Sequence, residues 1–265
     1  MSTPLRVGRI VALNMYPIYH HLEAVADPGL VFTDGLPATL NAALLSGALD
    51  VSAMSSIEYA RNADRLTLLP VASISAEGAV DSIQVFSRVP FEQMRSVAVT
   101  PHSATSVALL RILVGPDATF TPLTGAPAAA LAQVDGVLLI ADEALVGLRE
   151  GIAPIHTDLG ERWRATTGLP MVFAVWAARR DAVPATRIAH LMGLLADART
   201  RFADDPDAVV AAAAERFPFS AEYIRGYFGR LGYGFGPQER AGLHRFLEMA
   251  VDAGELDTLD GIDLG

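Results

Sequence analysis

The sequence contains no cysteine and no lysine, and these two absences limit the chemistry that it can support. Without cysteine there is no thiolate nucleophile and no cysteine metal site, and the absence also fits a reducing compartment. Without lysine, Schiff-base chemistry, lysine-bound pyridoxal phosphate and a Walker-type nucleotide site are excluded. All 20 basic residues are arginine, which a composition bias of the source explains most simply.

A basic face and a long apolar run are also missing. The formal net charge of −10 argues against a nucleic-acid partner, because phosphate neutralisation needs clustered positive charge. No apolar stretch approaches the roughly 18 residues of a membrane span. The N-terminus "MSTPLRVGRIVALNMYP" has no apolar core or cleavage site of a signal peptide. We therefore expect a cytoplasmic protein with no nucleic acid and no membrane as partners, and leave its oligomeric state open.

The standard catalytic motifs are absent as well. The six histidines show no metal-ligand spacing, and the chain has no GxSxG elbow and no GxGxxG loop. We expect no metal site, and we interpret His102 as a histidine of a surface turn. An anionic ligand would depend on hydroxyl groups and helix N-termini, which attract anions without net charge.

Short strand-like runs alternate with helical ones over the first two thirds of the chain. The strand-like runs are "RVGRIVAL", "DVSAMSS", "LTLLPVASI", "DSIQVFS", "SVAVT", "GVLLIA" and "GLPMVFAVWAA". The helical runs between them include "GLPATLNAALLSGAL", "IEYARNA", "SVALLRILV" and "DEALVGLRE". Such alternation favours α/β layers with mostly parallel strands.

Four consecutive helices are predicted after about residue 184, with a helix start at Asp205-Pro206 and a partial N-cap signature at Ser220. The "GYGFG" segment at 232–236 is interpreted as a turn between two of them. The chain therefore forms either one doubly wound domain or two lobes with a helical C-terminal region. In both architectures the hydroxyl-rich segments lie at the carboxyl edge of the strands, where ligands bind.

The segment "TPHSATSVALLRILV" at 100–114 has more hydroxyls than one helix cap needs. Ser103 is the candidate N-cap. Thr105 and Ser106 then lie beside free N–H groups of the first turn, with no Glu at the third helical position to close a capping box. This arrangement suits a carboxylate or a phosphate as well as it suits an ordinary capped helix.

A second strand in "DVSAMSSIEYA" also ends in hydroxyls, Ser55 and Ser56, before a helix. One serine can cap the helix and leave the other free, so two such helix ends suggest a ligand with two acidic groups. Asn14 follows the first strand, Ser82 lies in a strand, and Asp142 follows a buried strand as a predicted N-cap.

Taken together, the motifs resemble the chorismate dehydratase family of the futalosine route to menaquinone. The resemblance covers roughly residues 6–180, and its most specific segments are "SSIEYA", "TSVALL" and "TGLPMVFAVWAAR". A related lyase of the same pathway, which acts on cyclic dehypoxanthine futalosine, carries a catalytic His in an "IHEG"-like segment. This chain has "IADEAL" there, with Ala141 and Asp142, which favours the dehydratase.

The resemblance implies an α/β fold like that of the type II periplasmic binding proteins, with a ligand cleft between two lobes. Lobe one is expected to comprise residues 1–88 and 178–265, and lobe two residues 89–177. A non-catalytic protein that binds a small carboxylate remains the alternative on the same fold.

The implied reaction removes water from chorismate to give 3-[(1-carboxyvinyl)oxy]benzoate, without metal or cofactor. Asn14 and Ser82 are the expected catalytic residues, which orient the enolpyruvyl group and the departing hydroxyl while the substrate's own enolpyruvyl carboxylate takes the proton. The expected substrate-binding residues, which hold the dicarboxylate, are Ser55, Ser56, Ser103, Thr105, Ser106 and Asp142.

Overall fold

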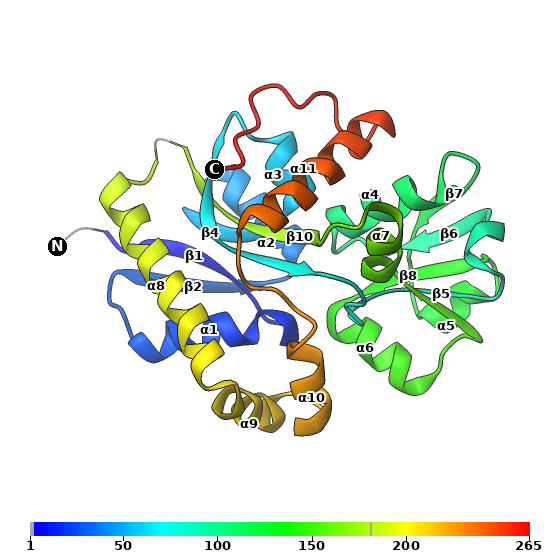
Figure 1. The fold of residues 1–265 in the computed structure, drawn as a ribbon, viewed down its shortest axis with the longest axis horizontal. Helices are drawn as coiled ribbons and strands as arrows, with labels where there is room; N and C mark the ends of the chain where they lie inside the picture. Colours follow the sequence, from blue (N-terminus) through cyan, green and yellow to red (C-terminus); the bar gives the residue numbers. More distant parts are fainter. Residues whose placement is uncertain (1–2, 181) are drawn as a thin grey trace.

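Two five-stranded sheets form the two lobes of the molecule (Figure 1). The computed structural model describes residues 3–180 and 182–265. The first sheet has the order β2-β1-β3-β10-β4, with β1 (Leu5–Ile10), β2 (Leu30–Gly35), β3 (Val51–Ser55), β4 (Leu66–Ala76) and β10 (Met171–Arg179). The second has the order β7-β6-β8-β5-β9, with β5 (Ile83–Ser87), β6 (Ser96–Val99), β7 (Thr119–Pro122), β8 (Gly136–Ile140) and β9 (Ile155–Asp158).

Both sheets are mixed, so the expectation of mostly parallel strands is wrong for half of each sheet. β1 pairs in parallel with β2 and β3, and β6 pairs in parallel with β7 and β8. β10 is antiparallel to β3 and β4, and β5 is antiparallel to β8 and β9. The reason is topological: β5 and β10 each enter a sheet from the other lobe, so no helical crossover within one sheet sets their direction.

The chain passes between the lobes before β5 and before β10. β5 belongs to the second sheet and β10 to the first, so the sheet changes between Ala76 and Ile83 and again between Thr167 and Met171. The expected boundaries at 88/89 and 177/178 lie after β5 and near the end of β10. The apolar runs alone do not reveal the sheet that a strand joins.

Helices cover both sheets, and the stretches at 37–46, 104–114 and 141–150 are helical as expected. The helices of the first two thirds are α1 (Tyr16–Val25), α2 (Pro37–Ser46), α3 (Ser56–Arg61), α4 (Ala104–Val114), α5 (Pro127–Leu131), α6 (Ala141–Glu150) and α7 (Leu159–Thr167). The sequence patterns did not predict α1, α5 and α7, nor the strands β2, β7 and β9. Short 3-10 turns, η1 (Leu13–Met15) and η2 (Phe91–Gln93), precede α1 and β6.

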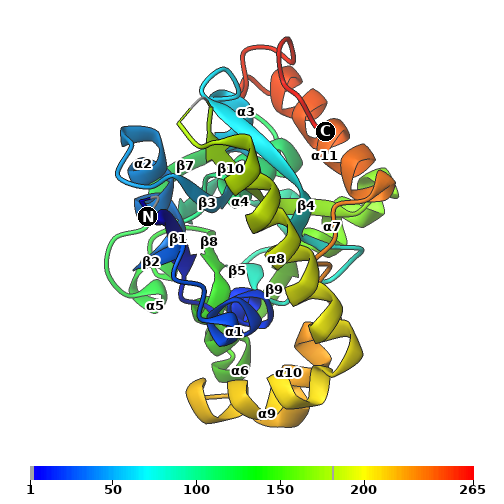
Figure 2. The ribbon, with the colours of Figure 1, turned by 90° about the vertical axis from the view of Figure 1, so that its left-hand side faces the viewer.

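The four predicted C-terminal helices are confirmed as α8 (Ala185–Asp204), α9 (Pro206–Arg216), α10 (Ala221–Phe228) and α11 (Pro237–Asp252). Asp205 and Ser220 cap α9 and α10 through their side chains. α8 packs on α1 and β4, and α9 and α10 lie together at the end of that layer (Figure 2). The "GYGFG" segment connects α10 to α11, and its Gly232 also pairs with Ser75 of β4.

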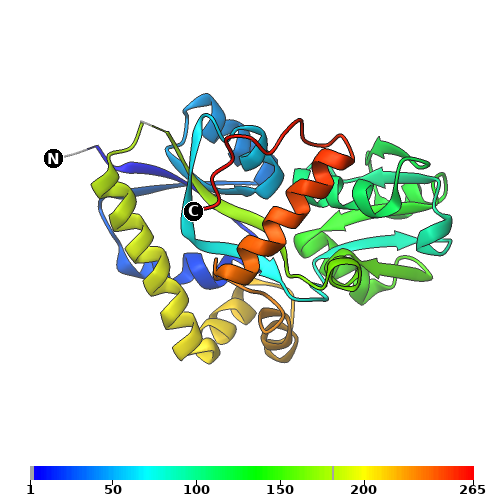
Figure 3. The same cartoon turned by 45° about the horizontal axis from the view of Figure 1, so that its top comes forward.

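α11 and a shared core join the two lobes. α11 contacts β10 and α3 of the first lobe and α4 of the second (Figure 3). A Cβ atom at Gly242 of α11 would lie 2.0 Å from the Pro170 carbonyl oxygen. The close approach of α11 to the chain just before β10 therefore requires glycine. One large hydrophobic cluster includes residues of both sheets, such as Val7 and Leu138. No helix in the described residues is long and apolar enough to cross a bilayer.

Candidate functional site

A cavity of about 210 Å³ lies between the lobes, where β1, β3 and β8 end and α4 and α6 begin. Its walls include apolar side chains such as Met54 and Phe173 and a small set of polar groups. Six of the eight residues expected to bind or transform a ligand line it, namely Asn14, Ser55, Ser82, Ser103, Ser106 and Asp142. Segments far apart in the sequence therefore meet here, as expected for the carboxyl edges of strands.

Asn14 and Asp142 face the cavity from opposite lobes. Asn14 lies in η1, and its buried side-chain oxygen has no hydrogen-bond partner in the described residues. Asp142 accepts a hydrogen bond at 3.1 Å from the backbone N–H of Leu13, and so it links α6 to η1 across the cleft. The prediction that Asp142 is the N-cap of α6 is wrong: Ile140 is the N-cap, and the carboxylate serves the other lobe instead.

Burial in the cleft raises the pKa of Asp142, and the hydrogen bond from Leu13 acts in the opposite direction. No arginine of the described residues lines this cavity. An anionic ligand would therefore meet hydroxyls, amides and backbone N–H groups, and its charge would further favour the protonated form of Asp142.

Ser82 precedes β5 rather than lying within a strand, in a segment of unusual backbone geometry. Its carbonyl accepts a 2.7 Å hydrogen bond from the N–H of Ala141. Asp81 and Ala141, which adjoin this contact, have left-handed φ angles of 56° and 51°. Non-glycine residues seldom adopt such angles, so surrounding contacts must hold the backbone in place. Residues 77–82, which connect the first sheet to the second, are called the crossing segment below.

Asp158 holds the crossing segment, residues 77–82, in place through hydrogen bonds. One oxygen of this buried carboxylate accepts from the backbone N–H groups of Val80 (2.9 Å) and Asp81 (2.7 Å) and from the side-chain amide of Gln84 (2.6 Å). The other oxygen accepts from the first turn of α7, of which Asp158 is the N-cap. Burial raises the pKa of Asp158, while the backbone N–H donors lower it. A single carboxylate thus links the crossing segment, which contains Ser82, to α7 by hydrogen bonds.

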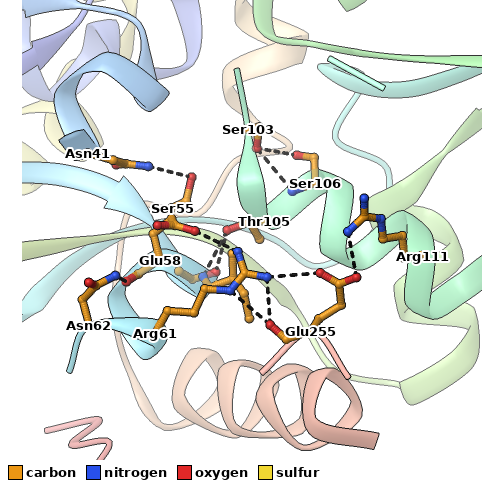
Figure 4. Close-up of polar contacts among 12 residues, drawn as sticks. Asn41, Ser55, Glu58, Arg61, Asn62, Ser103, Thr105, Ser106, Arg111 and Glu255 are labelled. Carbon is orange, nitrogen blue, oxygen red and sulfur yellow. Dashed lines mark hydrogen bonds and ion pairs between the residues drawn. The ribbon is translucent and has the colours of Figure 1, made fainter. Parts of the chain in front are cut away.

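The start of α4 confirms the expected N-cap. Ser103 Oγ accepts from the N–H of Ser106 at 3.2 Å, and the two hydroxyls lie 2.9 Å apart (Figure 4). His102 is half-buried in the turn before α4, as its interpretation as a turn histidine implies, and it also lines the cavity. The first-turn N–H groups of α4 have no carbonyl partner within the helix, which makes this wall suitable for an anion.

Ser55 and Ser56 take different positions. Ser55 lines the cavity and accepts a 3.4 Å hydrogen bond from the Asn41 amide. Neither serine caps α3 through its side chain, contrary to the expectation. The reason is that β3 and the first residue of α3 are buried, so each hydroxyl bonds to a neighbouring element instead.

Ser56 and Thr105 lie outside the cavity, at a contact between the lobes. Ser56 Oγ donates to the Val172 carbonyl at 2.8 Å and lies 3.2 Å from Thr105 Oγ1, which accepts from the N–H of Ile57. Both side chains are fully buried. They join α3 to α4 and thereby fix the distance between the two hydroxyl-bearing walls.

An ion-pair network lies on the outer side of the same two helices. Glu255 accepts from Arg61 of α3 at 3.1 Å and from Arg111 of α4 at 2.9 Å (Figure 4). The described residues contain no group of three His, Cys, Asp or Glu side chains that could hold a metal ion.

Asp158 and Asn41 are two residues of the site that the sequence patterns do not predict. Asp158 stands before a helix in "TDLGERW", a recognisable N-cap pattern, but nothing in that pattern points to the distant donors of 80–84. Asn41 is on the buried face of α2, where an unpaired amide is costly and a polar partner was to be expected.

Comparisons with known proteins agree with the sequence resemblance. A family profile described as "Menaquinone biosynthesis" matches residues 5–252. A Thermus thermophilus relative named chorismate dehydratase is 32% identical over 253 residues, which cover 89% of this chain and 91% of that protein.

Two solved structures have the same fold. A protein from Archaeoglobus fulgidus gives a TM-score of 0.77 at 19% identity, covering 96% of this chain and 98% of that one. A Candida albicans protein described as exhibiting the generic periplasmic binding protein fold gives 0.68 at 11% identity, covering 98% and 93%. The expected two-lobe fold is therefore confirmed.

Proposed function

The chain belongs to the menaquinone biosynthesis family, and we propose that within it this protein is a chorismate dehydratase that forms 3-[(1-carboxyvinyl)oxy]benzoate and water. The observation that carries the proposal is the cavity between the lobes, which gathers Asn14, Ser55, Ser82, Ser103 and Ser106 from both lobes. These groups bind oxygen-rich anions without any positive side chain.

The proposed reaction is an elimination that balances without an external reagent. The ring carbon that bears the enolpyruvyl ether loses its proton, and the electron pair forms the new ring double bond. Hydroxide leaves the neighbouring carbon and takes up a proton, so the net loss is one water and the ring becomes aromatic. Aromatisation supplies the driving force, and the enzyme's contribution is orientation and charge stabilisation. No redox step occurs, so no cofactor is proposed.

Each wall of the cavity has a proposed role. The first turn of α4, with Ser103 and Ser106, holds one carboxylate, because its free N–H groups and hydroxyls converge there. Ser55 contributes to the other carboxylate site. Asn14 orients the enolpyruvyl group, whose own carboxylate accepts the ring proton, and Ser82 donates a hydrogen bond to the departing hydroxyl.

Since Ser56 and Thr105 lie outside the cavity, we assign them to the support of these walls rather than to ligand contact. Ser106→Ala should therefore raise KM for chorismate several-fold with a smaller effect on kcat, whereas Ser56→Ala should act chiefly on stability.

The proposal is tested by incubating the purified protein with chorismate in the absence of added metal or cofactor and following the products by mass spectrometry. We expect an enol ether that is lighter than chorismate by one water. Tight binding without conversion would support the non-catalytic carboxylate-binding alternative. Turnover of cyclic dehypoxanthine futalosine instead would assign the protein to the related lyase.

A further inference from the structure

A buried tyrosine of the helical C-terminal region has a hydroxyl without a partner. Tyr227 of α10 is fully buried, and its hydroxyl makes no hydrogen bond to the described residues. Buried polar groups are normally paired, because a lone phenol loses its hydration without compensation. An unpaired hydroxyl at a buried position therefore requires a functional explanation or a partner that arrives with the ligand.

An ion pair connects the end of α10, where Tyr227 lies, to the crossing segment that contains Ser82. The N–H of Arg230 donates to the Tyr227 carbonyl at 3.0 Å, so the two residues are one turn apart. The Arg230 guanidinium forms a 2.6 Å ion pair with Asp81, the residue before Ser82. Arg230 lies in the turn that ends α10, and its ion pair holds this end of the helix against residues 77–82. The action of the Ser82 side chain on the Tyr227 phenol agrees with this placement.

The electrostatic surroundings of the phenol agree with this placement. Burial raises the pKa of Tyr227, the Ser82 side chain lowers it because its hydroxyl is placed to hydrogen-bond to the phenol oxygen, and the carboxyls of Asp142 and Asp81 raise it further. These three residues all lie in or beside the walls of the cavity. The phenol stays protonated at neutral pH and keeps its proton as a hydrogen-bond donor.

We propose that Tyr227 is a positioning residue for Ser82, which donates a hydrogen bond to the Ser82 hydroxyl when substrate fills the cavity. The inference rests on the proposed dehydratase function. With its oxygen occupied as an acceptor, Ser82 directs its own proton at the hydroxyl that leaves the ring. No proton is transferred along this chain, since both hydroxyls only donate hydrogen bonds. The helical region outside the main sequence resemblance thereby completes the site.

The substitution Tyr227→Phe tests the proposal because it removes only the unpaired oxygen. We expect kcat for chorismate to fall roughly 3- to 10-fold, the equivalent of one hydrogen bond between neutral groups. KM should stay within about twofold, since the phenol touches no substrate atom. The melting temperature should be equal or higher, since the hydroxyl has no partner to lose. A merely structural role would instead lower the melting temperature and leave kcat alone.

Two further variants make the test specific. Tyr223→Phe is the matched control on the same helix, where the ring stacks on Phe219, and it should leave kcat unchanged. In a Ser82→Ala background, Tyr227→Phe should have no further effect on kcat, because the positioned group is already missing. An active wild-type protein with a fully active Tyr227→Phe variant would overturn this inference alone. A wild-type protein that does not dehydrate chorismate would overturn the proposed function, and this inference with it.

Discussion

Asp142 combines two roles that conflict at neutral pH. Its carboxylate accepts the 3.1 Å hydrogen bond from Leu13 across the cleft, yet burial raises its pKa above the ordinary value of 3.8. The folded state therefore binds this proton more tightly than the unfolded state does. By linkage, the contribution of Asp142 to stability falls as the pH rises from 3.8 through its folded-state pKa.

The first prediction concerns the substitution Asp142→Asn, which keeps an oxygen for Leu13 and removes the buried charge. We expect a higher melting temperature than wild type at pH 7 and a much smaller difference near pH 3.5, where most of the carboxyl is protonated in both states. Thermal unfolding followed by circular dichroism between pH 3.5 and 8 measures this. Glu143→Gln is the control, because Glu143 lines the same cavity but is exposed. A stability difference that is independent of pH would contradict the account.

Among the short elements, α3 and α4 are held together by the buried pair Ser56 and Thr105. Thr105 Oγ1 is the acceptor for the N–H of Ile57, so it satisfies a backbone donor of the other lobe. The outer network of Arg61, Glu255 and Arg111 is partly exposed, and such surface pairs contribute only about 0–1 kcal/mol. The buried pair is thus the stronger determinant of the spacing between the two walls.

The second prediction follows for Thr105→Val, which keeps the shape of the side chain and removes the acceptor. The N–H of Ile57 then lacks a partner, and we expect a loss of about 1–3 kcal/mol in the free energy of unfolding. Urea denaturation measures it. Thr166→Val, at an exposed position of α7, should change the stability by less than about 0.5 kcal/mol. Equal effects of the two substitutions would show that the interlobe contact has no special weight.

The third prediction concerns the carboxylate that joins α7 to the crossing segment. Asp158→Asn can still cap the helix, but it cannot accept from both α7 and the donors at 80–84. We expect a loss of about 2–4 kcal/mol in stability and a lower kcat, because Ser82 is no longer held. Asp205→Asn, an N-cap of α9 remote from the cavity, is the matched control and should change neither quantity. A stable Asp158→Asn protein with wild-type kcat would contradict this interpretation.

The sequence predicted best those features that depend on local chemistry. Ser103 as N-cap and the Asp205-Pro206 helix start are set by neighbouring residues, and both are confirmed. The family resemblance and the two-lobe fold are confirmed as well. The sequence could not distinguish Ser55 from Ser56, because the two hydroxyls differ only in the distant element to which each one points.

Features that depend on long-range contacts were not predictable. The local pattern predicts that Asp142 is an N-cap, but its partner Leu13 is 129 residues away in the sequence. The directions of β5 and β10 depend on which lobe each strand crosses into, and a buried apolar run carries no such information. Tyr227 and Asp158 support Ser82 from elements that are distant in the sequence, and no local sequence motif marks that role.

On the scale of the whole molecule, the two lobes share one hydrophobic cluster, and α11 contacts elements of both. The fourth prediction is a single cooperative thermal transition, which calorimetry tests by comparing the calorimetric and van't Hoff enthalpies. In a slow Ser82→Ala variant, chorismate at about 100 times its Kd should raise the melting temperature by roughly 5–10 °C. Ser106→Ala added to that variant should reduce the shift. In the ligand-free protein, two separate thermal transitions would contradict the shared hydrophobic core of the two lobes.

The central claim is that the protein dehydrates chorismate in the cavity between its two lobes. A proton NMR time course of chorismate with equal concentrations of wild-type protein, Asn14→Ala and Ser82→Ala tests it most directly. With wild type we expect the ring signals of chorismate to give way to those of an aromatic enol ether, with no other product. Both variants should convert it at least about tenfold more slowly, the equivalent of 1.4 kcal/mol in the barrier. Unchanged chorismate with the wild-type protein, or wild-type rates in both variants, would contradict the account.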